Sequence, residues 1–251
     1  MNSRHFLNDK LIESFDERTF TEGKSFPWKA FDQLILPDAF ETLCNDFPPI
    51  ELFDRYWDAE RSYGQRPLNR YHLGYRRQSE SNEKTEKGVV LHDRLPKSWQ
   101  NFIEDLESPF YDAFIKKLIG ETRPQRRYTW HLGVTTSEVC PHVDDKKKAA
   151  THIFYFNKSS EWNPAWGGRL LVLENKKIEA MNPDFDDFEK ETPIEFTDNR
   201  SFLFKNEDSA WHGVRPLTCP AGSTRRLFNV IFARPRKERP HRIKSQYASP
   251  F

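Results

Sequence analysis

Apolar residues recur with helical spacing at three places in the first half of the chain. The first segment, LPDAFETLCNDF, places Phe40, Leu43, Cys44 and Phe47 at positions i, i+3, i+4 and i+7. Residues with this spacing lie on one face of an α-helix. Pro48 follows directly and predicts the end of the helix.

The second helical segment is SWQNFIEDLES, and the third is SPFYDAFIKKLIG. In the second, we expect Ser98 to cap the amino terminus. In the third, Ser108 is the expected cap, Pro109 stands at the first helical position and Gly120 lies just beyond the end. The predicted apolar faces consist of Trp99, Phe102, Ile103 and Leu106 in the second helix, and of Phe110, Ala113, Phe114, the Lys117 stem and Leu118 in the third.

The pattern changes to short apolar runs after residue 125. RRYTWHLGV, THIFYFN, GGRLLVLE, RSFLFKN and RRLFNVIFA are separated by segments rich in turn residues, which is typical of a sandwich or barrel. Helices followed by strands predict an α+β fold, a double-stranded β-helix (jelly roll) buttressed by N-terminal helices. We expect one domain over 1–251, with helical support mainly in 1–124, the jelly-roll core in 125–233 and a basic tail in 234–251.

Two further segments have no clear period. Residues 51–78 mix arginines with tyrosines, and they are either a meandering surface segment or a lid or wall over a substrate cleft. The acidic insertion 174–191 would frame the same cleft. Its run NPDFDDFEKE lacks the glycine of a calcium loop, so we expect a solvated loop there.

Composition narrows the class of protein. The formal net charge of +1 argues against a broad nucleic-acid-binding face, and 14% aromatic residues favour an ordered core rich in Phe and Trp. Cys44, Cys140 and Cys219 form no CxxC pair, which fits a reducing compartment. Without a signal-peptide pattern or a run of 18 apolar residues, we expect a cytoplasmic protein with no membrane contact.

The candidate chemistry begins at His142 and Asp144. This is the only His-x-acid tripeptide in the chain, and roughly one is expected by chance from 8 His and 38 acidic residues. A non-haem iron site needs two His and one carboxylate on one face of the metal, and alternate strand residues point the same way. His212, 70 residues after His142, is the candidate third ligand, although a histidine at such a place is, taken alone, more often a hydrogen-bonded loop residue. His131 and His152 are weaker rivals.

The order of the blocks resembles the 2-oxoglutarate- and Fe(II)-dependent dioxygenases, in their prolyl 4-hydroxylase-like branch. HVD is followed by THIFYFN, WGGRLLVL, PIEFTDNRSFLFKNEDSAWHGVRPL and STRRLFNVIF, in the family's order. FPWKAFDQLILPDAFETLCNDFP also resembles the N-terminal strand and helix of intracellular members. This resemblance implies that His142, Asp144 and His212 bind Fe(II).

The resemblance also implies a binding site for 2-oxoglutarate. An arginine of the last block would pair with its distal carboxylate, and Arg225 and Arg226 are both candidates because strand neighbours face opposite ways. Arg225 is preferred, since Asn229 then supplies the polar residue four positions later. Tyr155 would donate its hydroxyl to the same carboxylate, and Thr151 would line the pocket.

The implied reaction consumes O2 and 2-oxoglutarate, releases succinate and CO2, and hydroxylates an unactivated C–H bond. The substrate would be an amino acid, a peptide or protein residue, or a small metabolite. Halogenating relatives replace the carboxylate ligand by a small residue, so Asp144 disfavours halogenation. Two departures from the family are the insertion TCPAGS and Arg169, which stands where Glu is frequent. The alternatives are a non-catalytic jelly-roll module for a peptide or sugar, and a cupin-like metal enzyme, which would use more histidines.

Overall fold

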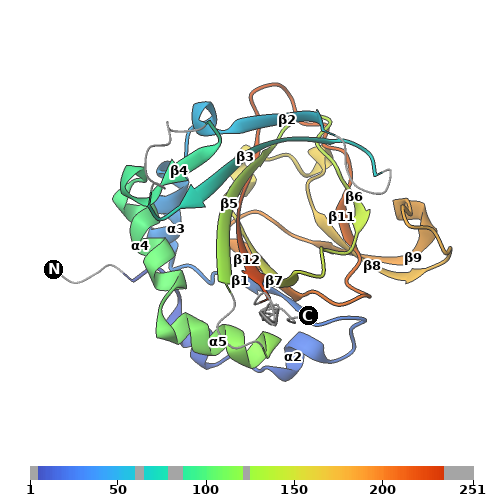
Figure 1. Cartoon of the computed structure of the whole chain (residues 1–251), viewed down its shortest axis with the longest axis horizontal. Helices are drawn as coiled ribbons and strands as arrows, with labels where there is room; N and C mark the ends of the chain where they lie inside the picture. Colours follow the sequence, from blue (N-terminus) through green and yellow to red (C-terminus); the bar gives the residue numbers. More distant parts are fainter. Residues whose placement is uncertain (1–4, 60–64, 79–86, 121–124, 235–251) are drawn as a thin grey trace, which may run out of the picture.

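The strands form two sheets that face each other across a central space, and the helices lie outside the larger sheet (Figure 1). The structure is a computed structural model, and it describes residues 5–59, 65–78, 87–120 and 125–234. This arrangement is the predicted double-stranded β-helix buttressed by helices.

The larger sheet has the strand order β1-β10-β7-β12-β5-β3-β2, and β4 pairs with β3. Its neighbours are antiparallel except for the parallel pair of β3 and β4. The strands of this sheet are β1 (Trp28–Asp32), β2 (Asp54–Ala59), β3 (Leu68–Arg76), β4 (Val89–Leu91), β5 (Gln125–Gly133), β7 (Lys148–Tyr155), β10 (Arg200–Lys205) and β12 (Arg225–Ala233).

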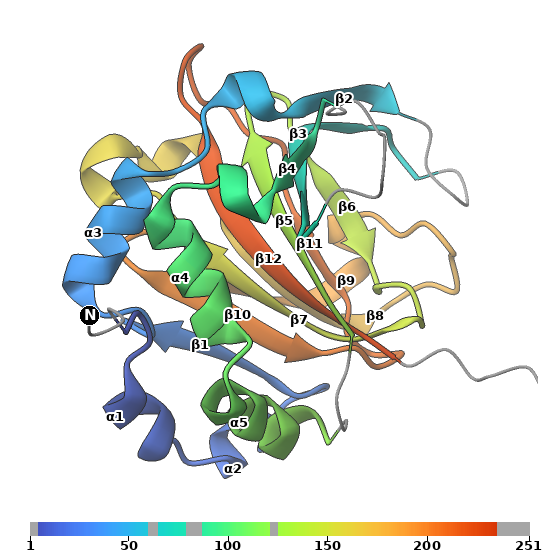
Figure 2. The same cartoon turned by 60° about the vertical axis from the view of Figure 1, so that its left-hand side comes forward.

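The smaller sheet has the order β6-β11-β8-β9 and forms the opposite wall. Its strands are β6 (Val139–His142), β8 (Leu170–Lys176), β9 (Phe188–Ile194) and β11 (His212–Val214). Figure 2 shows the helices gathered on the far side of the larger sheet. They are α1 (Asp9–Glu13), α2 (Arg18–Thr21), α3 (Pro37–Asn45), α4 (Lys97–Leu106) and α5 (Pro109–Ile119), with short 3-10 turns η1 (Ile50–Leu52), η3 (His92–Arg94), η4 (Ser159–Glu161), η5 (Pro164–Trp166) and η6 (Phe185–Asp187).

The predicted capping residues are confirmed for α5, but the predicted N-cap of α4 is wrong. Ser108 caps α5 by accepting a hydrogen bond from the Tyr111 amide, and Gly120 ends the helix with φ +74°. In α4, Pro96 is the N-cap residue, so the prediction for Ser98 is wrong. Ser98 lies inside the helix, where its hydroxyl donates to Asp46 Oδ2 at 2.5 Å.

The buried face of α5 also differs from the prediction. Ala113 and Lys117 are exposed, and the buried residues are Tyr111, Phe114, Ile115, Leu118 and Ile119. The observed face is itself apolar at helical spacing, so the prediction took the wrong one of two overlapping apolar faces. Tyr111 Oη lies 2.7 Å from Nδ1 of His152 on β7, which ties this face of the helix to the sheet.

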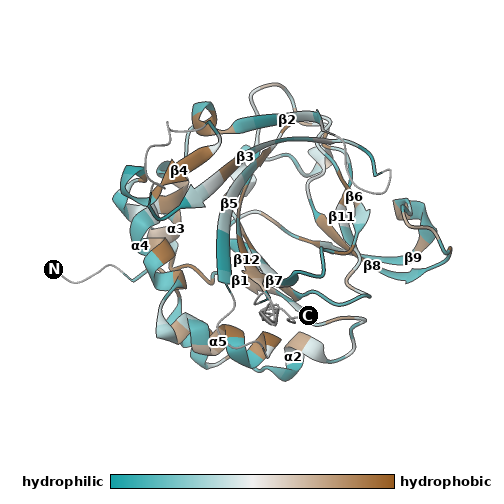
Figure 3. Ribbon diagram, in the orientation of Figure 1, coloured by the Kyte–Doolittle hydropathy of each residue, from teal (hydrophilic) through white to brown (hydrophobic). Residues whose placement is uncertain are grey.

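Successive side chains of β12 point alternately into the hydrophobic core under the helices and into the space between the two sheets. Phe228, Val230 and Phe232 belong to the cluster under the helices, whereas Arg225, Leu227, Asn229 and Ile231 line a cavity between the sheets. The cluster is aromatic, as the composition predicts: the ring centroids of Trp99 and Trp130 lie 5.2 Å apart. In Figure 3, α4 and α5 carry apolar and polar residues on different sides, as amphipathic packing requires.

Residues 51–78 contribute β2 and β3 to the larger sheet, so the prediction of a surface meander is wrong. Tyr71 and Tyr75 pack against the core, while Arg70 lines the cavity. Tyrosines, which carry a polar hydroxyl on an apolar ring, stand on the buried side of β3, and this mixed character hid the strand period. The acidic segment likewise contains β9. None of the helices in the described parts of the chain is long and apolar enough to cross a membrane.

Candidate active site

A cavity of about 1060 Å³ lies between the two sheets and holds most of the residues singled out from the sequence. His142, Asp144 and His212 line it together with Thr151, Arg225 and Asn229. Tyr155 is not among the lining residues, because it is buried behind them with 1% of its surface exposed.

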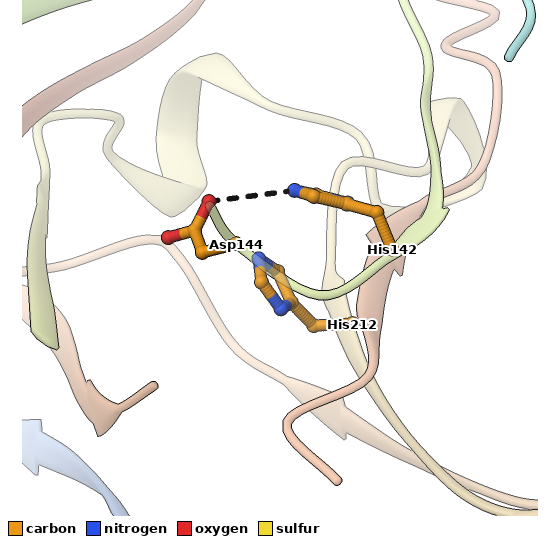
Figure 4. Close-up of side chains that lie close together, drawn as sticks. All are labelled: His142, Asp144 and His212. Carbon is orange, nitrogen blue, oxygen red and sulfur yellow. Dashed lines mark ion pairs between the residues drawn. The ribbon is translucent and has the colours of Figure 1, made fainter. Parts of the chain in front are cut away.

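Strand pairing brings His212 close to His142 and Asp144, although it lies far from them in the sequence. His142 is the last residue of β6 and His212 the first of β11, and they are direct partners in the antiparallel register. Asp144 follows β6 by two residues. Their possible ligand atoms all lie within 4.8 Å of one another, and Figure 4 shows the side chains converging. No other group of three His, Cys, Asp or Glu side chains in the described ranges has this spacing.

Both histidines are oriented by backbone carbonyls. His142 Nδ1 lies 3.0 Å from the Cys140 carbonyl, and His212 Nδ1 lies 2.9 Å from the Ala210 carbonyl. A carbonyl can only accept, so Nδ1 carries the proton and Nε2 keeps its lone pair. Hydrogen bonding at the second ring nitrogen is the usual way in which proteins orient a metal-binding imidazole.

Asp144 is held as a carboxylate. Its Oδ1 accepts a hydrogen bond from Lys148 Nζ at 2.6 Å and its Oδ2 accepts one from Thr151 Oγ1 at 3.1 Å. Burial by itself would raise the pKa of Asp144, but interaction with His142 and the charge of Lys148 hold it well below its usual value. Burial and the neighbouring His142 lower the pKa of His212 to about 3, so this imidazole is neutral near pH 7. Deprotonated carboxylate and neutral imidazole are the forms that bind a metal.

The environments of the two arginines differ as strand alternation predicts. Arg225 is buried, its Nε donates to the Gly168 carbonyl at 2.7 Å, and its guanidinium carbon lies 5.2 Å from the centre of the Tyr155 ring. Within the described residues, no carboxylate forms an ion pair with it. Arg226 lies on the other face of β12 and pairs with Glu161.

Two buried polar atoms of the residues singled out from the sequence have no hydrogen-bond partner within the described chain. They are the Tyr155 hydroxyl and Oδ1 of Asn229. Burial raises the pKa of Tyr155 to about 12, so its hydroxyl stays protonated and can donate. Arg225 has no anionic partner among the described residues, and a buried hydroxyl without a partner loses free energy, so an anionic ligand would stabilise both groups. The cavity is therefore suited to a carboxylate at this place.

The rival histidines are not part of the cluster. His152 faces the helices, where its Nδ1 lies 2.7 Å from Tyr111 Oη and its Nε2 lies 3.1 Å from Ser201 Oγ. His131 lines the cavity but does not belong to the metal-binding group. The larger set of histidines that a cupin-like site would need is thus not found in the described parts of the chain.

Two contributors to the site were missed by sequence reasoning. Lys148 was not among the candidate site residues, but it begins β7 and pairs with Asp144. Gly168 approaches Arg225 with φ +100°, and a Cβ atom there would lie 3.3 Å from Arg225 Cδ. The adjacent glycines before β8 were the available signal for this close approach.

Comparisons with known proteins agree with this geometry. Residues 120–233 match the model of the 2OG-Fe(II) oxygenase superfamily. No curated protein matches the sequence.

Solved structures extend the similarity to most of the chain. A Pseudomonas putida prolyl-4-hydroxylase aligns with a TM-score of 0.56 and 12% identity, covering 89% of this chain and 100% of the other. A Trichoplax adhaerens prolyl hydroxylase, crystallised with a peptide fragment of the hypoxia inducible factor, aligns with a TM-score of 0.56 and 14% identity, covering 90% of each chain. At these identities the two structures support the fold, and the family model supports the chemistry. Residues 120–233 form a domain of the 2OG-Fe(II) oxygenase superfamily, and the protein is a dioxygenase that depends on Fe(II), 2-oxoglutarate and O2.

Proposed function

We propose that His142, Asp144 and His212 bind Fe(II) and that the enzyme hydroxylates an unactivated C–H bond. The substrate would be an amino acid, a peptide or protein residue, or a small metabolite. The observation that carries this proposal is the convergence of two imidazoles and one carboxylate within 4.8 Å, on the wall of a cavity. Two His and one carboxylate leave the remaining metal positions free for co-substrates.

We propose that Arg225 binds the distal carboxylate of 2-oxoglutarate and that Tyr155, Thr151 and Asn229 complete this pocket. Arginine suits the role because its planar guanidinium can donate two parallel hydrogen bonds to a carboxylate. The Tyr155 hydroxyl would donate a further one. Thr151 would act mainly through the metal ligand, since its hydroxyl already donates to Asp144.

The metal and 2-oxoglutarate together supply the oxidising power for the reaction, and the protein supplies position and protonation state. The carbonyls of Cys140 and Ala210 hold the two imidazoles in the ligating tautomer. Thr151 and Lys148 hold Asp144 in place. Apolar residues, including Ile153, Leu170 and Leu227, line the same cavity and exclude water from part of it.

A spectroscopic titration tests this proposal. Anaerobic addition of 2-oxoglutarate to the Fe(II)-loaded protein should produce a visible charge-transfer band, and O2 should then convert 2-oxoglutarate into succinate. Asp144→Ala should abolish both the band and succinate formation. Asp145→Ala is the matched control, because Asp145 is the adjacent carboxylate and is exposed. Full succinate formation by Asp144→Ala would refute the ligand assignment.

A further inference from the structure

Asp144 differs from the other two proposed metal ligands in how its backbone is held. His142 ends β6 and His212 begins β11, and these two residues are direct partners in the antiparallel register. Asp144 instead lies on the loop between β6 and β7 (Figure 4), and no strand pairing in the described ranges includes it. The position of its carboxylate therefore depends on contacts that fix this loop.

The side-chain amide of Asn206 makes such contacts. Its Nδ2 lies 3.1 Å from the carbonyl oxygen of Asp144, 3.0 Å from that of Asp145 and 3.1 Å from that of Lys148. Because a carbonyl oxygen only accepts hydrogen bonds, the amide must present its nitrogen to all three. Asn206 is 5% exposed, so water competes little for these bonds. One side chain thus holds the loop from the proposed ligand to the first residue of β7.

Asn206 also belongs to the segment that leads to the third proposed ligand. It directly follows β10, and its backbone amide donates to the Ala149 carbonyl at 2.8 Å, so its own position is fixed by β7. His212 lies six positions later in the sequence, and its Nδ1 lies 2.9 Å from the Ala210 carbonyl. The Asn206 amide therefore connects the loop that carries Asp144 to the chain segment that carries His212.

The oxygen of this amide shows that packing by itself does not favour asparagine at position 206. Oδ1 of Asn206 is buried and has no hydrogen-bond partner within the described chain. A buried acceptor without a partner destabilises the folded state, and an apolar side chain would not carry this penalty. The three loop carbonyls, which need a donor, are thus the contacts that account for an amide at this position.

We propose that Asn206 is a positioning residue of the metal centre: its amide holds the backbone of Asp144 so that the carboxylate and His212 can bind the same metal ion. This inference rests on the proposed function, because it concerns the ligands of that same site. Hydrogen-bond partners that orient metal ligands typically contribute about 10- to 100-fold to metal affinity. Loss of the Asn206 amide should therefore weaken metal binding by about that factor, although all three ligands remain.

Co(II) alone is the probe, because its visible absorption reports on its ligands and no co-substrate is needed. It would be titrated into the metal-free protein, with Asp144→Ala as the reference for loss of the carboxylate. Asn206→Ala should raise the dissociation constant for Co(II) at least tenfold. The absorption spectrum of bound Co(II) should also change, because Asp144 has lost its fixed position, whereas loss of a merely stabilising side chain would leave the spectrum as it is.

Asn199→Ala is the matched control. Asn199 directly precedes β10, at the opposite end of the strand from Asn206, is 7% exposed, and donates from its Nδ2 to the Ile35 carbonyl at 2.6 Å. Both alanine variants remove a buried amide that bonds to the backbone, so both should melt at a lower temperature in the absence of metal. At a temperature where both variants are folded, only Asn206→Ala should bind Co(II) more weakly.

A second pair of variants keeps the size of the side chain, in case Asn206→Ala does not fold. Asn206→Asp replaces the donor by a carboxylate, and Asn199→Asp is its control. The added negative charge would by itself attract Co(II). Weaker binding of Co(II) by Asn206→Asp would therefore report on the lost position of Asp144, and we expect this result.

The outcomes separate this inference from the proposed function. If Asp144→Ala binds Co(II) as the unmodified protein does, the ligand assignment is wrong and this inference is wrong with it. If Asp144→Ala loses Co(II) but Asn206→Ala, or Asn206→Asp in its place, binds with an unchanged dissociation constant and spectrum, only the positioning role is wrong. An equal loss of Co(II) affinity in the Asn199 variants would trace the effect to general stability and would also overturn the proposal.

Discussion

Replacing Arg225 by glutamine tests which basic residue of β12 binds the distal carboxylate of 2-oxoglutarate. Arg225 is 6% exposed, and its Nε donates a hydrogen bond to the backbone carbonyl of Gly168. Removing one partner of a buried charge pair costs about 3–5 kcal/mol, because the other charge remains buried without compensation. At about 1.4 kcal/mol for each factor of ten, the dissociation constant for 2-oxoglutarate should rise by about two to three and a half orders of magnitude.

The assay is calorimetric titration of 2-oxoglutarate into the Zn(II)-loaded protein, with Arg226→Gln as the control. Arg226 forms an ion pair with Glu161, whose side chain is 48% exposed, so its loss should cost about 1 kcal/mol of stability or less. The same variant should bind 2-oxoglutarate normally. A thermal melt of Arg225→Gln without 2-oxoglutarate checks folding, and we expect no loss of stability, because burial already disfavours the unpaired cation and lowers its pKa.

Two results would refute this reasoning. The first is that Arg226→Gln weakens binding of 2-oxoglutarate while Arg225→Gln does not, which would assign the role to Arg226. The second is that Arg225→Gln unfolds at a clearly lower temperature in the absence of 2-oxoglutarate. In that case the buried guanidinium would stabilise the fold, and a change in affinity would not report on a contact with the carboxylate.

Two further predictions concern the surroundings of the site. Gly168→Ala should weaken 2-oxoglutarate binding by about 1–3 kcal/mol in the same titration, since the new Cβ would meet Phe196 Cζ at 2.8 Å in a residue with φ +100°. Gly222→Ala, with φ +89° and no atom within 4 Å, should leave binding intact. Burial lowers the pKa of His152 to about 3, so below pH 6.5 the unfolded chain takes up a proton that the folded chain refuses, and stability should fall by about 1.4 kcal/mol per pH unit down to about pH 3. Urea unfolding at several pH values should show a shallower slope for His152→Gln, and an unchanged slope would contradict the assignment.

The pattern of apolar and polar residues within one segment was sufficient to predict where some helices and strands begin and end. The boundaries of β12 follow RRLFNVIFA residue for residue, and α5 begins and ends at its predicted cap residues. Where a segment offered more than one apolar face or no clear period, the pattern failed. In α5 the observed buried face includes Tyr111, whose hydroxyl contacts His152, and residues 51–78 contribute strands although their sequence shows no period.

The sequence alone determined which residues are candidates for the site: the pair His142 and Asp144, the later His212, and Arg225, which strand alternation separates from Arg226. Only the tertiary structure decided which of these residues lie close together. His142 and His212 become neighbours because β6 and β11 pair, although the two residues are 70 positions apart in the sequence. Gly168 lies so close to Phe196 and Arg225 that a Cβ atom there would be 2.8 Å from Phe196 Cζ and 3.3 Å from Arg225 Cδ. The pairing of strands also places Lys148 and Arg70 at the cavity. Strand register is a long-range property, since every partner is set by a segment distant in sequence, and no local window contains that information.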